Sequence, residues 1–288
     1  MLFRSEELSG RSFDRFFDQW LYHGGCPKLE VSYEWLQEDR LAKITVKQTQ
    51  SQGPFLLPTE IRFWLNRRSF DREIVLDSAQ QDFYFALHAE PDIVRFDPEL
   101  TLLADVKFKT PRNMLYAQLD NPSDVVGRLL AIRALKETKD KKAVAELKEA
   151  ANSDPFYGVR IDAAAALQEI HTDDAFDALI DSMEQSDARV RLRVVQAIGG
   201  FYRPEVPPCL EDVLAKEKNP EILMAAIRGL GRYQGPQTRE AISRYLQSTS
   251  YRNELAMAAI DAIAMLNDPA FIPEMTATLR DQIGRAHV

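Results

Sequence analysis

Cysteine is scarce in this sequence, which contains two, Cys26 and Cys209, among its 288 residues. They lie far apart along the chain, and no C-x-x-C pair supplies the usual spacing of a structural zinc site. A disulfide framework would need more cysteines at closer spacing. We therefore expect two free thiols.

Histidine is also scarce and lacks the spacing that metal binding or acid–base catalysis needs. No H-E-x-x-H motif places two histidines on one helix face, and Ser5, Ser9 and Ser12 near His23 do not by themselves define a triad. The G-x-S-x-G, Walker-type and G-x-G-x-x-G motifs are missing too. We predict no catalytic, cofactor-binding or metal-ligating residue in the chain. Surface or structural roles are expected for His23, His88, His171 and His287.

The sequence has no excess of basic residues. Its formal net charge is −8 and its pI is near 5.2, whereas nucleic-acid-binding proteins usually present a basic face to phosphates. No run of 18 apolar residues is present, and residues 1–10 lack the apolar core of a signal peptide. We expect neither a nucleic-acid partner, nor an anionic membrane, nor a membrane span. The compartment is unknown, and we favour a soluble, cytoplasmic chain.

Both ends of the sequence resemble cuts in a longer protein. Met1 opens almost directly onto a helical pattern, and residues 283–288 read IGRAHV. That string resembles one reading frame of a common sequencing adapter. We therefore expect an adapter-derived tail at 283–288, with the natural sequence ending inside a repeat.

The sequence changes its hydrophobic period twice. Phe13, Phe16, Phe17 and Trp20 fall on one face of a short helix. Residues 28 to about 110 then alternate apolar and polar side chains in six or seven short segments separated by turn-like stretches. This pattern predicts an antiparallel β-sandwich of about 85 residues.

After Pro111 the period becomes helical and an internal repeat emerges. Related segments begin at residues 127, 159, 190, 222 and 255, and each is followed by a second helical pattern with larger apolar residues. The first helices carry small residues at matching positions, which lets neighbouring helices approach closely. Stacked helix pairs of this kind form a solenoid, and the unit resembles HEAT repeats. The small residues are Ala131, Ala163, Ala226 and Ala259 at one position, and Ala134, Ala166, Ala197, Gly229 and Ala262 at another.

Two charged clusters within the repeats could bind a ligand. Asp173, Asp174, Asp177 and Asp181 could face one cation, although a solvated acidic surface is the simpler interpretation. The second cluster could hold a carboxylate or a phosphate. Alternatively, one of its members pairs with an acidic residue of the adjacent repeat while the others are solvated. Its members are Arg189, Arg191 and Arg193.

The N-terminal segment resembles the end of the catalytic domain in aminopeptidase N-like (gluzincin) zinc metallopeptidases. That family closes the domain with an S-G-x-x-[FL]-x-x-F-F-x-x-W run and a G-x-P turn leading into a strand. Here the run spans Ser9 to Trp20, and Gly25, Cys26 and Pro27 form the turn. The similarity is close over residues 9–35 and extends beyond them as the same order of sandwich and helical repeats. The family's H-E-x-x-H, later glutamate and tyrosine match no position here, so no catalytic residue is carried over.

This resemblance implies a multidomain chain of α and β structure. Residues 1–27 would be the terminal helix of a missing upstream catalytic domain, 28–110 the β-sandwich, and 111–282 the HEAT-like α-helical repeat solenoid. The chain would hold no cofactor, while zinc would act in the parent enzyme on peptide substrates. The expected role is a non-catalytic C-terminal region that supports the catalytic domain and limits peptide access.

Two other functions remain open. The same architecture could serve as a non-catalytic scaffold that binds a protein partner on its repeat surface. A stand-alone HEAT-repeat protein that binds nucleic acid or modifies a cofactor protein is a third hypothesis, which the acidic balance and the sandwich disfavour. The first two differ in whether an upstream domain carries the zinc ligands.

Overall fold

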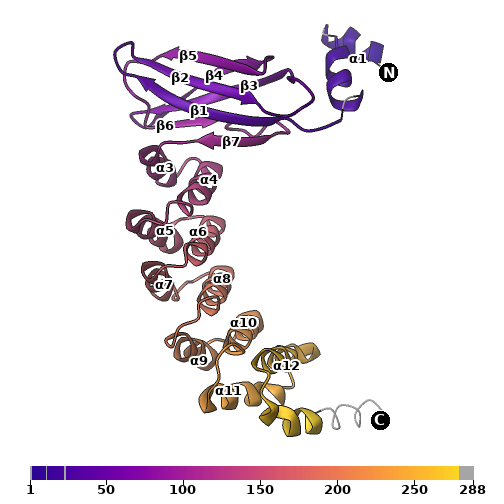
Figure 1. Ribbon diagram of the computed structural model, residues 1–288, viewed down its shortest axis with the longest axis vertical. Helices are drawn as coiled ribbons and strands as arrows, with labels where there is room; N and C mark the ends of the chain where they lie inside the picture. Colours follow the sequence, from indigo (N-terminus) through magenta and orange to yellow (C-terminus); the bar gives the residue numbers. More distant parts are fainter. Residues whose placement is uncertain (1, 11, 23, 279–288) are drawn as a thin grey trace. The chain divides into compact units, whose positions relative to one another are not determined.

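The computed structural model describes residues 2–10, 12–22 and 24–278 (Figure 1). His23, His287 and the predicted adapter-derived tail at 283–288 lie outside these residues. Contacts between residues divide the chain into two compact units, Met1–Gly127 and Arg128–Val288. This boundary lies one helix beyond Pro111, the residue after which the apolar pattern changes from strand-like to helical.

Short helical elements precede the sheets. They are α1 (Leu2–Ser9), α2 (Asp14–Phe17) and a π-helical turn (Asp18–Tyr22). The aromatic stripe predicted as one continuous helix therefore contains a change of helical pitch after Phe17. The Trp20 ring lies 5.4 Å from the Phe55 ring and packs against the sandwich core.

Within the described residues, two sheets face each other across one hydrophobic core. The first has the strand order β5-β2-β1-β7 and the second β4-β3-β6. The strand bounds are β1 Lys28–Leu36, β2 Leu41–Gln48, β3 Leu57–Leu65, β4 Arg68–Leu76, β5 Gln80–Ala86, β6 Ile93–Phe96 and β7 Asp105–Lys109.

One strand pair differs from the antiparallel pattern that the sequence predicts. β7 pairs parallel to β1, with Leu29 opposite Val106, while the other pairs are antiparallel. Between β1 and β7 the chain forms strands of both sheets, so no tight hairpin joins these two strands and fixes the direction of β7. Leu103, although apolar, lies in the loop before β7 and is 72% exposed.

The predicted alternation accounts for the sandwich core. Leu29 and Val31 of β1 and Ile44 of β2 are buried, as are Ile61 and Phe63 of β3. Side chains of alternate residues point to the same face of a strand, so these residues line the space between the sheets. The short strand β6 is buried along its whole length.

Helices make up the rest of the described chain. Figure 1 shows α6, α8, α10 and α12 in one row and α5, α7, α9 and α11 in another, and successive members of the first row are in contact. The helix bounds are α3 Arg112–Leu119, α4 Val125–Leu135, α5 Lys141–Ser153, α6 Tyr157–Ile170, α7 Asp173–Ile180, α8 Ala188–Gly199, α9 Val206–Lys216, α10 Pro220–Leu230, α11 Pro236–Leu246 and α12 Glu254–Leu266, and residues 272–278 are also helical.

The small residues predicted at matching repeat positions lie where the helices of this row meet. Ala163, Ala197, Ala226 and Ala259 are fully buried. Polar side chains cap helix starts in the repeats: Asp187 accepts a hydrogen bond from the Arg189 amide at the start of α8, and Asn219 accepts one from the Glu221 amide at the start of α10. The β-sandwich and the repeat array predicted from the sequence are thus both present.

Candidate functional site

The N-terminal segment is attached to the sandwich by a polar contact and an apolar one. The Gln19 amide pairs with the Leu56 backbone in both directions: Leu56 N donates to Gln19 Oε1 at 2.6 Å, and Gln19 Nε2 donates to Leu56 O at 3.2 Å. Beside it, an apolar groove of about 820 Å³ is lined by Phe16, Trp20 and Leu103 among others. Phe16 remains 52% exposed.

Replacing Gln19 with alanine is expected to loosen this attachment without unfolding the sandwich. The substitution removes both hydrogen bonds, and the buried part of the Leu56 backbone loses its partner. We expect the Leu56 amide to exchange with solvent about tenfold faster, because one lost bond of typical strength changes a local opening equilibrium by that order. Hydrogen exchange measures this, with the Val46 amide in β2 as an internal control. Unchanged exchange at Leu56 would contradict the proposed contact.

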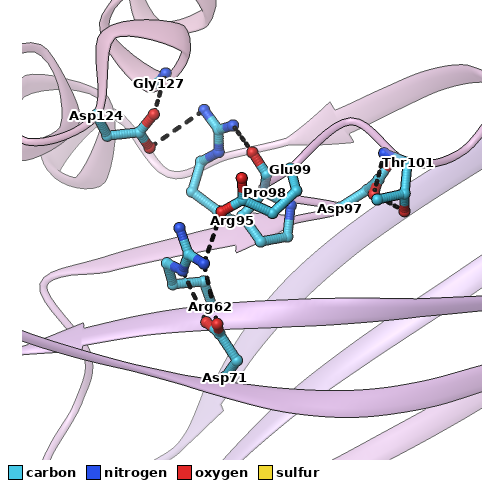
Figure 2. A network of polar contacts seen from close by, with 9 residues as sticks. All are labelled: Arg62, Asp71, Arg95, Asp97, Pro98, Glu99, Thr101, Asp124 and Gly127. Atoms are coloured by element: carbon cyan, nitrogen blue, oxygen red, sulfur yellow. Dashed lines mark hydrogen bonds and ion pairs between the residues drawn. The ribbon is translucent and has the colours of Figure 1, made fainter.

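A dense polar network lies at the junction of β6, the following loop and α4 (Figure 2). Arg95 is 2% exposed; its Nη2 donates to the Pro98 carbonyl at 3.3 Å, and its Nη1 lies 3.5 Å from Asp124 Oδ2. Asp124 Oδ1 accepts from the Gly127 amide at 2.7 Å and so caps α4. Burial lowers the pKa of Arg95, and the nearby Asp124 carboxylate opposes that shift.

The other members of this network bind one another or the backbone. Arg62 binds Asp71 with two parallel hydrogen bonds of 2.7 and 2.9 Å and pairs with Glu99 at 2.8 Å. Asp97 accepts from Thr101 and from the Leu102 amide. Each carboxylate therefore neutralises a cation or caps backbone amides, which indicates a structural joint rather than a reactive centre.

The scarce histidines and cysteines occupy separate places. His171 ends α6 in a left-handed conformation and stacks on Phe201, with ring centres 4.2 Å apart. His88 is exposed beyond β5. Both cysteines are free; Cys26 is exposed, and burial raises the pKa of the Cys209 thiol. Among the described residues, no three histidine, cysteine or acidic side chains lie close enough together to hold a metal ion.

The acidic cluster of α7 is occupied by neighbouring bases. Asp173 pairs with Arg203, and Asp181 with Lys148 at 2.5 Å. Asp174 lies 3.5 Å from Lys141. These three carboxylates therefore point to different partners and do not converge on one cation.

The three arginines at the start of α8 are each engaged. Arg189 pairs with Asp187 and stacks over Tyr157, while Arg193 donates to Gln168 Oε1 at 2.7 Å. Arg191 pairs with an acidic residue, its Nε lying 2.8 Å from Glu217 Oε2, but Glu217 belongs to the same repeat, which begins at residue 190, and not to an adjacent one. All three bind residues of the chain itself, so they do not form an open anion site.

Glu217 provides a stability effect that depends on pH. The hydrogen bond from Arg191 and those from the Asn219 and Lys218 amides lower the pKa of Glu217 from 4.5 to about 2. Above pH 4.5 the carboxylate is charged in both states and stabilises the fold; as pH falls towards 2, the unfolded state takes up the proton first and the stabilisation is lost.

A Glu217→Gln variant is therefore expected to be less stable than the native chain at neutral pH, by about 1 kcal/mol once screening by solvent is included. The difference should shrink below pH 4.5 and vanish near pH 2. Urea unfolding across this pH range measures it. A difference that stays constant with pH would show that the carboxylate charge is not responsible.

A recurring polar link inside the repeats was not singled out by the sequence. Arg128 and Arg191 occupy the same place in their repeats, and each pairs with an acidic residue 26 positions later, Asp154 and Glu217. Arg160 holds that place in the repeat between them. Hydrogen bonds from Arg189 are the main cause of the lowered pKa of Asp187, and the charge of Arg160 adds a smaller contribution. The arginine that directly follows the first three repeat starts was the available signal.

The first helices of the repeats also form an open groove of about 610 Å³, which we call the repeat groove. Gly199 and Gly229 lie in its floor, where α8 and α10 approach so closely that a Cβ on Gly199 would lie 3.4 Å from Gly229 Cα. Leu192, Met224 and Met265 add apolar side chains. Its polar residues are Gln168, Gln196, Glu221, Arg228 and Arg232.

Family comparison identifies the repeats. The HEAT-repeat family matches residues 112–199, 177–264 and 208–286, which together cover more than half of the chain. The chain belongs to the HEAT-repeat family. The HEAT-like units predicted from the 31–33-residue spacing are therefore confirmed, and the repeat groove lies on the first helices of successive HEAT repeats.

Solved structures add a likeness that includes the sandwich. Aminopeptidase A of Legionella pneumophila, in complex with aspartic acid, matches with a TM-score of 0.51 and 12% sequence identity. The match covers 92% of this HEAT-repeat chain and 42% of the aminopeptidase. At this identity the likeness concerns the fold, and the chain spans less than half of that enzyme's length. A comparison with curated proteins gives no significant match.

The structure also bears on the membrane question. Within the described ranges, no helix combines the length and the apolar character needed to cross a bilayer.

Proposed function

We propose that this chain is the non-catalytic C-terminal region of a zinc aminopeptidase of the aminopeptidase N-like (gluzincin) type. The observation that carries the proposal is the joint match of motif and architecture. The Ser9 to Trp20 run and the Gly25-Cys26-Pro27 turn are followed by a sandwich and HEAT repeats. The fold of the Legionella aminopeptidase supports the same order over 92% of this chain.

In this proposal the zinc ligands belong to another part of the polypeptide. The histidines and carboxylates described above are dispersed or bound to arginine and lysine, so they do not fit a zinc-activated water. The sandwich and the repeats would support the catalytic domain and limit the peptides that reach it. Zinc, peptide substrate and upstream catalytic domain are thus partners of the parent protein.

The first test is the reading frame upstream of Met1 in the source DNA. We expect it to continue through H-E-x-x-H and a later ligand glutamate, and the native protein to be much larger than 32.8 kDa on an immunoblot. The full protein should release amino acids from aminoacyl chromogenic substrates, and a chelator should abolish this activity. A stop codon directly upstream would refute the proposal.

The alternative is a non-catalytic scaffold of the same architecture. The open repeat groove favours it, because a protein-binding surface needs exposed apolar side chains. An upstream domain of the same fold without zinc ligands would select this alternative.

A further inference from the structure

The repeat groove has exposed apolar side chains that the fold itself does not cover. Met265 is 50% exposed, and Met224 is partly exposed. Methionine is flexible and polarisable, so surfaces rich in it adapt to aliphatic partner side chains. Gly199 and Gly229, which also line the groove, add no side chain to it.

The charges of the groove are unevenly distributed along α10. Glu221 lies in the first turn of this helix, and Arg228 lies in its last turn, about 10 Å away at 1.5 Å per residue. Arg232 lies just beyond the end of the helix. Arg228 pairs with Asp261 at 3.0 Å, and both side chains are half exposed. In the part of the chain that the structure describes, Arg232 forms no ion pair and donates to the Gly199 carbonyl at 3.3 Å.

The positive end of the groove contrasts with the rest of the protein. The chain has a net charge of −8, so an acidic ligand is repelled by most of its surface and attracted at Arg232. Arg193 adds a further positive charge next to the groove, because it donates a hydrogen bond to the lining residue Gln168. Complementary charge of this kind selects and orients a partner.

We propose that the repeat groove binds a short acidic segment of a partner protein, with aliphatic side chains against Met224 and Met265 and a carboxylate on Arg232. Glu221 disfavours a second carboxylate at the opposite end, so the acidic residues lie on one side of the aliphatic ones. Binding through this groove is a property of the chain itself and is independent of whether the parent protein holds zinc.

The test begins with selection of a random phage-displayed peptide library on the immobilised 288-residue chain. Enriched peptides are expected to combine aliphatic residues with aspartate or glutamate on one side. Synthetic fluorescein-labelled copies then give dissociation constants by fluorescence anisotropy at low and high salt. Failure to enrich peptides, or enrichment of basic or uncharged ones, would overturn the proposal.

Variants then locate the site. Arg232→Glu should weaken binding about tenfold, since an attractive charge pair becomes repulsive, whereas Arg244→Glu should not change it. Arg244 is a suitable control because it lies on α11, is largely exposed and does not line the groove. Equal effects of the two substitutions would refute a groove site.

A charge swap separates recognition from loss of structure. Peptides in which lysine replaces the acidic residues should bind Arg232→Glu better than the native chain, which a misfolded variant could not do. Met265→Glu tests the apolar side of the groove at an exposed position and should also weaken binding of the acidic peptides. Unaltered binding by Met265→Glu, or failure of the charge-swapped peptides, would contradict the assignment.

Discussion

Replacing Arg128 with methionine is expected to lower the free energy of unfolding of the repeat array by about 3–5 kcal/mol. Arg128 Nε lies 2.7 Å from Asp154 Oδ2, and the two side chains are only 3% and 6% exposed. Methionine preserves much of the side-chain volume but removes the charge, which leaves a buried carboxylate without its cation. Urea unfolding followed by circular dichroism measures the change.

A matched substitution on the same helix provides the control. Arg133 is 67% exposed and lies 4.0 Å from Asp162, so Arg133→Met should change stability by about 0–1 kcal/mol. The double variant Arg128→Met, Asp154→Leu should recover much of the loss, because it removes the stranded carboxylate. Equal effects of Arg128→Met and Arg133→Met would show that burial of the first pair is unimportant.

Adding one methyl group at Gly231 should destabilise the array by about 1–3 kcal/mol. A Cβ on Gly231 would lie 2.7 Å from Ala262 Cα and 2.9 Å from Ala262 O, both backbone atoms of α12. Since backbone cannot rotate away as a side chain can, Gly231→Ala would have to separate α10 from α12. Thermal unfolding measures the effect.

Gly235 offers a control four residues later. A Cβ there would meet no atom within 4 Å, and its φ of 163° is extended backbone that alanine also adopts. Gly235→Ala should therefore be neutral, or slightly stabilising because it restricts the unfolded chain. If Gly231→Ala were equally neutral, the close approach of α10 and α12 would not be present in solution.

Local patterns in the sequence predicted much of this fold, because they act over short distances. Asp187 and Asn219 stand directly before the helices that they cap, and buried alanines recur with the repeat. The parallel pairing of β7 with β1 depends on residues more than 70 positions apart, for which no local signal exists. Leu103 shows the same limit of local patterns: it is apolar, but it lies exposed in the loop before β7.

The candidate site was less predictable for the same reason. The sequence drew attention to Arg189, Arg191 and Arg193 as a group, yet each one binds a different part of the chain. The repeat groove instead combines Met224, Arg232 and Met265 from neighbouring repeats, which only stacking brings together. The spacing of the repeats could have identified equivalent positions, but not which of them stay exposed.

The contacts that join one repeat to the next have a mechanical consequence. Lys136 bonds Glu169, Lys148 bonds Asp181 and Arg228 bonds Asp261, each pair 33 residues apart. Two of these pairs join the repeats that begin at residues 127 and 159, and the third joins those that begin at 222 and 255. A chain pulled from both ends would release such joints one at a time. Every release would free about 32 residues, or roughly 110 Å of extended chain at about 3.4 Å per residue. Under tension, the array would then extend in steps of equal length.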